Sequence, residues 1–263
     1  MQPNNSKNQM ILADLHCHTV KSYDAFTTNR ELLNACIVKG INLIAITEHD
    51  LVNKIQKKDF HKNGINVIDG CEYTTNRGAH IIGLFVNKPI KNANYKEIIE
   101  HIKNQAGIVL IPHPFKKGSG VCAIYKDPSY ILSNSDMIEL YNGGYKNSKF
   151  EEKEILSFSR KYNINLLANS DSHKVDQIGY YVNYFKSTQD IDLKSLLLNN
   201  KPELFIDKSS KKAPRNPSII QKNKNYQSII IKVPFFIKRF IKFILYLFSK
   251  RKPFIPSYSK LIY

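Results

Sequence analysis

Acidic residues are missing from the last 56 residues of this chain, although the same stretch holds 14 lysines and arginines. The first 207 residues are nearly balanced, with 25 basic and 22 acidic residues, so most of the net charge of +17 lies in the tail. The first part therefore lacks the electrostatic signature of a long polynucleotide groove. We predict a globular domain over residues 1–207 and a basic appendage over residues 208–263, with a linker rich in proline and lysine at residues 209–217.

Cysteine is scarce and forms no recognisable motif. Cys17, Cys36, Cys71 and Cys122 show no CxxC spacing, which argues against a zinc ribbon, a redox pair and a disulfide framework. The chain also opens without an apolar run long enough for a signal peptide, because residues 1–9 are polar. We expect reduced cysteines and a cytoplasmic globular domain.

Histidine, by contrast, follows a pattern. Six of the eight histidines lie in short polar clusters, and each cluster stands at the edge of an apolar run typical of a β-strand. The predicted strands cover residues 11–15, 43–47, 66–69, 79–86, 108–111, 137–141 and 166–169. Helices are predicted between and after them, at residues 28–39, 51–62, 95–105, 148–162 and 191–198. This alternation predicts an α/β fold with parallel strands, and seven strands favour a barrel, whose active sites lie at the carboxyl ends of the strands.

The clusters offer nine candidate metal ligands. Because residues i and i+2 of a strand face the same side, His16 and His18 can hold one ion while Cys17 points away. Imidazoles combined with carboxylates suit Mn, Zn or Fe, and nine ligands are enough for two or three ions. The set comprises His16, His18, Asp24, His49, Glu72, His80, His113, Asp171 and His173.

Taken singly, several of these residues have simpler explanations. His80 alone in an apolar strand is more often a hydrogen-bonded core histidine, and His113 between two prolines is typical of a turn. Their joint placement at strand ends favours a metal site. His61 and His101 fall on predicted helices, and we expect them at the surface.

The motifs around these ligands are Asp14-Leu-His-Cys-His-Thr19, Ser22-Tyr-Asp-Ala25, Thr47-Glu-His-Asp50, Gly70-Cys-Glu72, His80-Ile-Ile-Gly83, His113-Pro114 and Ser170-Asp-Ser-His173. In kind and order they resemble the motifs of the PHP (polymerase and histidinol phosphatase) superfamily, over about residues 11–185. Two departures are mild. Glu48 stands where the family often has Asp, and Ser-Tyr-Asp-Ala replaces the commoner Ser-Asp-Gly.

The resemblance implies a distorted seven-stranded β/α barrel that holds three divalent ions. It also implies a division of the ligands. His16, His18, Glu72 and Asp171 hold the first ion, Asp24, His49 and His173 hold the second, and His80 and His113 hold the third with Glu72 as a bridge. All nine positions are filled, which argues against an inactive copy.

Clustered divalent ions favour hydrolysis of a phosphate ester, because they lower the pKa of a bridging water and supply hydroxide without a protein nucleophile. Arg77, Lys116 and Lys117 are predicted to contact the phosphate, and Tyr23 and Tyr141 are candidates for stacking on a nucleobase. We expect a small phosphomonoester or a nucleotide as substrate. The alternatives are a 5′–3′ exonuclease acting on single-stranded DNA or RNA, and a non-catalytic membrane- or nucleic-acid-binding module with a structural metal.

The tail contains one amphipathic segment. On a helical wheel of residues 233–249 the basic side chains share one arc and the apolar ones fill most of the rest. We predict a helix on the inner face of the cell membrane, with Lys238, Arg239 and Lys242 on anionic headgroups and Phe240 at the acyl boundary. A helix packed on the barrel or on a second subunit is an alternative, as is a nucleic-acid-binding segment. The oligomeric state stays open.

Overall fold

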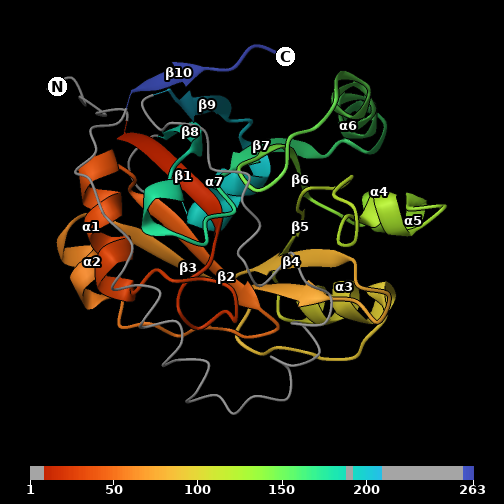
Figure 1. The fold of residues 1–263 in the computed structure, drawn as a ribbon, viewed down its shortest axis with the longest axis horizontal. Helices are drawn as coiled ribbons and strands as arrows, with labels where there is room; N and C mark the ends of the chain where they lie inside the picture. The colour runs from red at the N-terminus through yellow and green to blue at the C-terminus, as the bar shows by residue number, and fades with distance from the viewer. Residues whose placement is uncertain (1–8, 188–191, 209–256) are drawn as a thin grey trace, which may run out of the picture.

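A computed structural model describes residues 9–187, 192–208 and 257–263 of the chain. Their strands form one curled sheet in the order β10-β9-β8-β1-β2-β3-β4-β5-β6-β7 (Figure 1). The strands are β1 (Gln9–Cys17), β2 (Leu43–His49), β3 (Asn66–Thr74), β4 (His80–Leu84), β5 (Ile108–Ile111), β6 (Met137–Asn142), β7 (Asn165–Asn169), β8 (Tyr181–Ser187), β9 (Glu203–Asp207) and β10 (Tyr258–Lys260). The α/β class predicted from the sequence is confirmed, although the sheet of the described residues has ten strands rather than seven.

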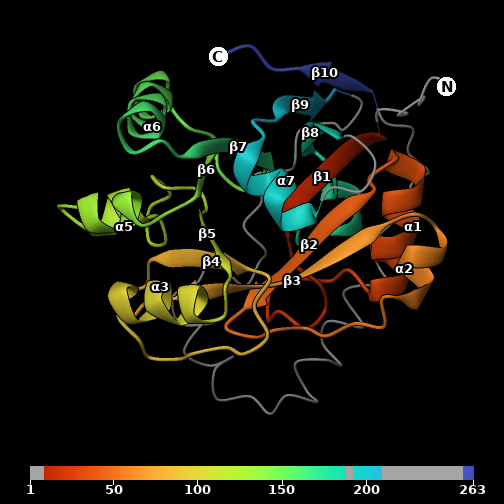
Figure 2. The same ribbon diagram turned by 180° about the vertical axis from the view of Figure 1, so that it is seen from behind.

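The helices flank the sheet on two sides. They are α1 (Asn29–Lys39), α2 (Lys58–Lys62), α3 (Tyr95–Asn104), α4 (Val121–Ile124), α5 (Ser129–Ser133), α6 (Lys149–Tyr162), α7 (Leu193–Asn199) and the 3-10 turn η1 (Val175–Gln177). Figures 1 and 2 show α1 and α2 together beside the strands β1–β3, and α3, α5 and α6 on the opposite flank. β5 is buried along its whole length, because side chains cover both of its faces.

The first helix follows its sequence signals, whereas the second is shorter than predicted. Thr28 caps α1 in a reciprocal capping box with Glu31, and Gly40 ends it in the left-handed region at φ 66°. Helix α2 begins at Lys58 rather than near residue 51. Before it, the side-chain amide of Asn53 donates to Glu48 Oε1 at 3.1 Å. This hydrogen bond holds the segment against β2 instead of in a helix.

Strand β4 runs against its neighbours. It pairs antiparallel with both β3 and β5, so the prediction of parallel strands throughout is wrong at this position. The reversal follows from the short turn between Thr74 and His80, since a hairpin can join only antiparallel strands. His80 begins β4 opposite the end of β3, and it therefore lies at the same end of the sheet as the carboxyl ends of the parallel strands.

Side-chain amides connect β7 and β1, the strands between which the curled sheet bends back on itself. The main chains of these regions meet in one isolated parallel bridge between Cys17 and Ser172. Further along, Asn183 of β8 accepts a hydrogen bond from the Ala168 amide at 2.9 Å, and the Leu15 amide donates to Asn169 Oδ1 at 3.0 Å. Buried amides thus take the place of backbone hydrogen bonds where the strands diverge.

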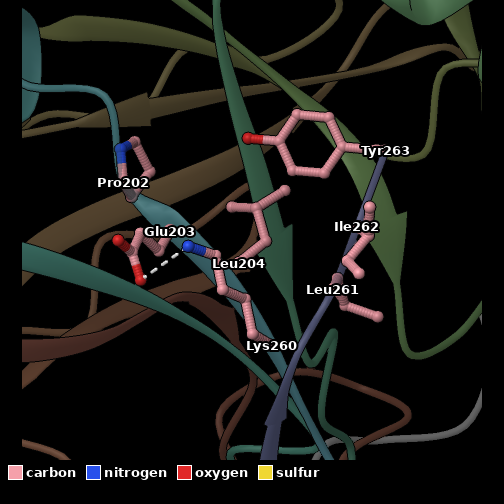
Figure 3. A pocket seen from close by; sticks show the side chains of 7 residues that line it. All are labelled: Pro202, Glu203, Leu204, Lys260, Leu261, Ile262 and Tyr263. Carbon is pink, nitrogen blue, oxygen red and sulfur yellow. Dashed lines mark ion pairs between the residues drawn. The ribbon is translucent and has the colours of Figure 1, made fainter.

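The last residues return to the sheet. Tyr258 of β10 pairs with Asp207 of β9, and the Lys208 amide donates to the Ser257 carbonyl at 2.8 Å. Figure 3 shows the pocket between β9 and the end of the chain, where Lys260 Nζ lies 3.1 Å from Glu203 Oε2. The predicted boundary at residue 207 stays a prediction, but residues 257–263 pack on the globular domain.

The predicted membrane-contact residues Lys238, Arg239, Phe240 and Lys242 lie outside the described residues, as does the predicted amphipathic helix. Within residues 9–187, 192–208 and 257–263, no helix has the length and apolarity needed to cross a bilayer.

Candidate metal centre

All nine predicted ligands meet at one end of the sheet. They come from the ends of β1, β2, β3, β5 and β7, from the beginning of β4 and from the segment between β1 and α1. Most are fully buried, and His80 and His173 are partly exposed, with side-chain exposures of 15% and 23%. Nine side chains that lie between His16 and His173 in the sequence thus form a single cluster.

Glu72 lies at the middle of this cluster. Its two carboxylate oxygens face different groups of imidazoles. Oε2 lies 3.5 Å from His16 Nε2, 3.3 Å from His18 Nε2 and 3.1 Å from His49 Nδ1, and Oε1 lies 2.8 Å from His80 Nδ1 and 3.2 Å from His113 Nε2. A carboxylate placed between two sets of nitrogen donors has the geometry of a bridging ligand.

The first two histidines are oriented through their other ring nitrogens. His16 Nδ1 donates to Glu139 Oε1 at 2.9 Å. His18 Nδ1 donates to Ser22 Oγ at 3.1 Å, because the hydroxyl proton of Ser22 is already given to Glu48. The Nε2 atoms of the two imidazoles therefore face each other, 3.2 Å apart, where a metal ion or a shared proton can lie between them.

The spacing of these atoms suits a tetrahedral ion. Five of the distances among His16 Nε2, His18 Nε2, Glu72 Oε2 and Asp171 Oδ1 run from 3.2 to 3.5 Å. Ligands about 2.1 Å from a tetrahedral metal are about 3.4 Å from one another. This quartet can therefore hold one ion with little movement.

A second group of donors surrounds Asp24. Its Oδ2 lies 3.2 Å from His173 Nε2 and 3.5 Å from His49 Nε2, and His173 Nδ1 donates to the Asp171 carbonyl at 2.9 Å. Asp24 Oδ1 and His113 Nδ1 are buried without a hydrogen-bond partner among the described residues. Buried polar atoms are rarely left so, and an ion or a water would satisfy them.

The carboxylates of the cluster are held ionised. Burial alone raises the pKa of Glu72, but the charges on His80, His16 and His49 outweigh it and hold that pKa well below its usual range. The pKa of Asp24 and that of Asp171 are lowered in the same way against burial, chiefly by His173 and by Lys116 respectively.

The imidazoles respond in the opposite direction. Burial lowers the pKa of His16 and of His49, but the surrounding carboxylates raise both well above the usual value. The pKa of His173 is also raised, by Asp24 against burial. His113 differs, since burial and the charge of Lys116 lower its pKa to about 4. Without metal, the raised pKa values favour protonation of these imidazoles, and their positive charge offsets that of the carboxylates.

Metal binding is therefore expected to release protons. A divalent ion must displace the protons of His16, His49 and His173, whose pKa values are raised, so the affinity should increase as the pH rises through the neutral range. Calorimetric titration with Mn²⁺ or Zn²⁺ in buffers of different ionisation enthalpy measures the number of protons released. An affinity that does not change between pH 6 and pH 8 would contradict this assignment.

Three residues of the centre have left-handed backbone conformations. Asp50, His113 and Asp171 have φ values of 51°, 28° and 47°, which cost energy for residues with a Cβ. Such conformations persist where the surroundings hold them, and they concentrate at functional sites. Nearby, a Cβ added to Gly143 would lie 2.1 Å from the Ser170 carbonyl oxygen, so only glycine allows β6 and the Asp171 segment to approach this closely.

Sequence reasoning missed Glu139. This fully buried residue of β6 accepts hydrogen bonds from His16 Nδ1, from the His113 amide at 2.8 Å and from the side chains of Asn142 and Asn169. A carboxylate within the apolar run Met-Ile-Glu-Leu-Tyr was the available signal. The apolar run predicts a buried strand, but it does not indicate which side chain the carboxylate of Glu139 meets.

Glu48 has a comparable role on the other side of the centre. It is fully buried and accepts hydrogen bonds from Thr19, Ser22 and Asn53, including the Ser22 amide at 2.9 Å. Because Ser22 Oγ also accepts from the His49 amide, the network links Glu48 to two ligand histidines.

The three predicted phosphate contacts are placed differently. Lys116 Nζ lies 3.3 Å from Asp171 Oδ2, and that carboxylate raises the pKa of the amine although burial lowers it. Arg77 is exposed and lies over the ring of Tyr125, with 5.0 Å from its guanidinium carbon to the ring centroid. Lys117 is exposed. Among the described residues, Lys116 is thus the one candidate of the three that contacts a predicted ligand.

A family model described as PHP domain matches residues 14–194, a span that contains all nine predicted ligands. The chain belongs to the PHP domain family. The resemblance indicated by the motifs is thereby confirmed.

Related sequences span bacteria and archaea. An uncharacterised protein of Methanocaldococcus jannaschii is 34% identical over 51% of this chain and 83% of its own length. A probable phosphatase of Acetivibrio thermocellus is 22% identical over 78% of this chain and 98% of its own length. A 5′-3′ exoribonuclease of Haemophilus influenzae is 36% identical, over 28% of this chain and 29% of its own length.

Solved structures share the PHP fold. A two-domain protein of Bacteroides vulgatus, described as containing a predicted PHP-like metal-dependent phosphoesterase, matches with a TM-score of 0.60 and 20% identity, over 75% of this chain and 65% of that one. A lesion-specific endonuclease of Pyrococcus furiosus matches with a TM-score of 0.57 and 20% identity, over 72% of this chain and 55% of that one. At these identities the likeness concerns the fold.

Proposed function

We propose that this chain hydrolyses a small phosphomonoester or a nucleotide with three divalent ions held by the nine ligands. Membership of the PHP domain family makes it a metal-dependent phosphoesterase, a hydrolase that acts on phosphate ester bonds. The observation that carries the proposal is the position of Glu72, whose two oxygens each face a separate group of imidazoles. The quartet around His16 takes the first ion, the group around Asp24 the second, and His80 and His113 the third.

Bound divalent ions would polarise the phosphate oxygens and lower the pKa of an attacking water. The chain's own residues prepare the site for them. Glu139 and Ser22 hold the rings of His16 and His18 with Nε2 directed inward. Lys116 adds a positive charge next to Asp171, where it can neutralise a phosphate oxygen.

The near-neutral charge of residues 1–207 favours a small substrate over a long polynucleotide. The alternative, a 5′–3′ exonuclease on single-stranded DNA or RNA, is supported by the exoribonuclease relative and by the fold shared with a lesion-specific endonuclease. An exonuclease releases a nucleotide from a 5′ end, so it needs only the terminal part of the strand at the ions.

A substrate screen tests the proposal. The full chain is used, because β10 pairs with β9. After dialysis with Mn²⁺, Zn²⁺ or Fe²⁺ it is offered monophosphates, bisphosphates and a 5′-phosphorylated oligonucleotide, with His49→Ala as the inactive control. Phosphate release from the small esters supports the proposal, and release of mononucleotides from the oligonucleotide alone favours the exonuclease. No release of either product from a chain shown to contain metal would overturn it.

Lys116→Gln is expected to lower kcat/KM by about tenfold, mostly through KM, because one charge-assisted contact to phosphate is lost. Steady-state kinetics on the best substrate measure the effect, with Lys126→Gln as a matched surface control. Lys117→Gln should change less, since Lys117 is exposed. Equal kinetics for Lys116→Gln and the wild type would remove Lys116 from the proposed phosphate site.

The tail proposal is independent of the active site. If residues 233–249 bind anionic membranes as an interfacial helix, the full chain should float with phosphatidylserine vesicles. Changing Lys238, Arg239 and Lys242 together to glutamate should then abolish flotation without altering phosphatase activity. Flotation that survives the triple change excludes the interfacial helix.

A further inference from the structure

The surroundings of the metal centre differ in chemical character from one side to the other. On the β5 side the loop after His113 carries Lys116, whose amine contacts Asp171. On the β1 and β2 side, three apolar side chains are exposed: Val20 at 38%, Tyr23 at 52% and Leu51 at 39%. Val20 and Leu51 each lie two residues after a predicted ligand histidine, and Tyr23 directly precedes Asp24. We call Val20, Tyr23 and Leu51 the apolar rim.

Tyr23 is held in place on both sides along the chain. Before it, the Ser22 amide and hydroxyl both donate to the buried Glu48. After it, the buried Asp24 faces His49 and His173. The backbone of Tyr23 therefore has little freedom although half of its side chain is open to water, and such a preorganised ring costs little entropy to bind against.

The ring of Tyr23 lies directly against the ligands. Its centroid is 5.0 Å from that of the His49 ring, with 28° between the planes, and His49 in turn stacks on His18 at 4.5 Å. Only the ring of His49 thus lies between Tyr23 and His18, a predicted ligand of the first ion. The organic part of an ester whose phosphate lies at the ions must pass close to it.

The other candidate tyrosine is occupied elsewhere. Tyr141 stacks on Tyr181, with centroids 5.8 Å apart and 22° between the planes. Both belong to strands of the sheet, and within the described residues Tyr141 makes no ring contact with a predicted ligand. Of the two tyrosines considered from the sequence, Tyr23 alone adjoins a ligand ring among the described residues.

We infer that the apolar rim is the leaving-group subsite, that it takes a flat aromatic group such as the base of a nucleoside monophosphate, and that Tyr23 determines this specificity by stacking. The three side chains of the rim offer apolar surface and a π-face, which suit a planar ring better than a polyol. The exposed Lys21 between Val20 and Tyr23 adds a positive charge beside this surface. The phosphate then lies over the ions with Lys116 on its other side. This inference rests on the proposed phosphoesterase function and narrows its substrate class.

The test compares two esters that share a phosphate but differ in the leaving group. Adenosine 5′-monophosphate and glycerol 3-phosphate are assayed with the Mn²⁺-loaded full chain and with two variants of it. Tyr23→Phe keeps the aromatic ring, and Tyr23→Leu keeps apolar bulk but removes the ring. Tyr130→Leu, an exposed tyrosine on α5, is the matched control. Tyr23→Leu is expected to lower kcat/KM for the nucleotide by about tenfold to a hundredfold. Its kcat/KM for glycerol 3-phosphate should change little, and Tyr23→Phe should behave as the wild type.

Equal losses on both esters, or no loss on the nucleotide, would overturn the inference, because a general effect on the site does not distinguish leaving groups. If neither ester is cleaved, the proposed function fails in its own right. The uncleaved esters are then stable ligands, and calorimetry on the same variants decides the inference. Weaker binding of the nucleotide to Tyr23→Leu alone supports the subsite, and unchanged binding refutes it.

Discussion

Glu72→Gln is expected to abolish phosphoesterase activity, with a loss of about a thousandfold or more in kcat, since it removes a charge that two of the three proposed ion positions share. The buried carboxylate faces five imidazoles, and a glutamine offers one oxygen and no charge in its place. Metal content should fall with activity. Elemental analysis of the purified chain measures this, and we expect about three ions per wild-type chain and fewer in the variant.

Glu100→Gln makes the same chemical change on the exposed face of α3 and serves as the control. Thermal unfolding separates loss of the site from loss of the fold. The charge of Glu72 helps to raise the pKa values of His16 and His49, so its removal should lower both pKa values. NMR of the histidine rings can follow this change. A Glu72→Gln variant that retains full metal content and activity would exclude a bridging role.

Glu139→Gln should weaken metal binding by about tenfold to a hundredfold, although Glu139 is not itself a predicted ligand. Its oxygens accept hydrogen bonds from His16 Nδ1, from the backbone amide of His113 and from the side-chain amides of Asn142 and Asn169. A glutamine NH₂ group would direct its hydrogens at one or more of these donors. The ring of His16 then loses the partner that keeps Nε2 directed at the ions.

Competition with a chromogenic chelator measures the affinity of the Glu139 variant, and the Glu100→Gln chain is again the matched control. Excess metal should restore much of the activity, because the nine ligands are still present. That rescue separates a positioning residue from a ligand, since Glu72→Gln should not recover. Unaltered affinity in Glu139→Gln would mean that the hydrogen bond to His16 does not orient the ring.

Much of the site could be predicted because its chemistry is local in the sequence. His16 and His18 share one face of a strand by spacing alone, and Asp171 and His173 repeat that spacing on another. Polar residues after apolar runs indicated one end of the sheet, and the structure places all nine candidates there. The bounds of helix α1 could be predicted in the same way, because its capping box and its terminal Gly40 are short-range signals.

Long-range partners could not be read in this way. Glu139 lies 123 positions from His16, and no spacing rule connects a carboxylate in one buried strand with an imidazole in another. The reversal of β4 depended on a tight hairpin that the apolar pattern did not reveal, because an apolar run looks the same in either direction. The late start of α2, at Lys58 instead of residue 51, likewise depends on a contact between Asn53 and Glu48 that no local pattern indicates.

The sequence by itself determined the α/β class, the family and the identity of the candidate ligands, because these follow from periodicity and from motifs a few residues long. The tertiary structure alone decided how the candidate ligands are arranged around Glu72, which carboxylates contact the imidazoles, and which tyrosine lies beside the cluster. Those features arise where strands distant in sequence converge. Only the packed sheet brings their side chains within hydrogen-bonding distance.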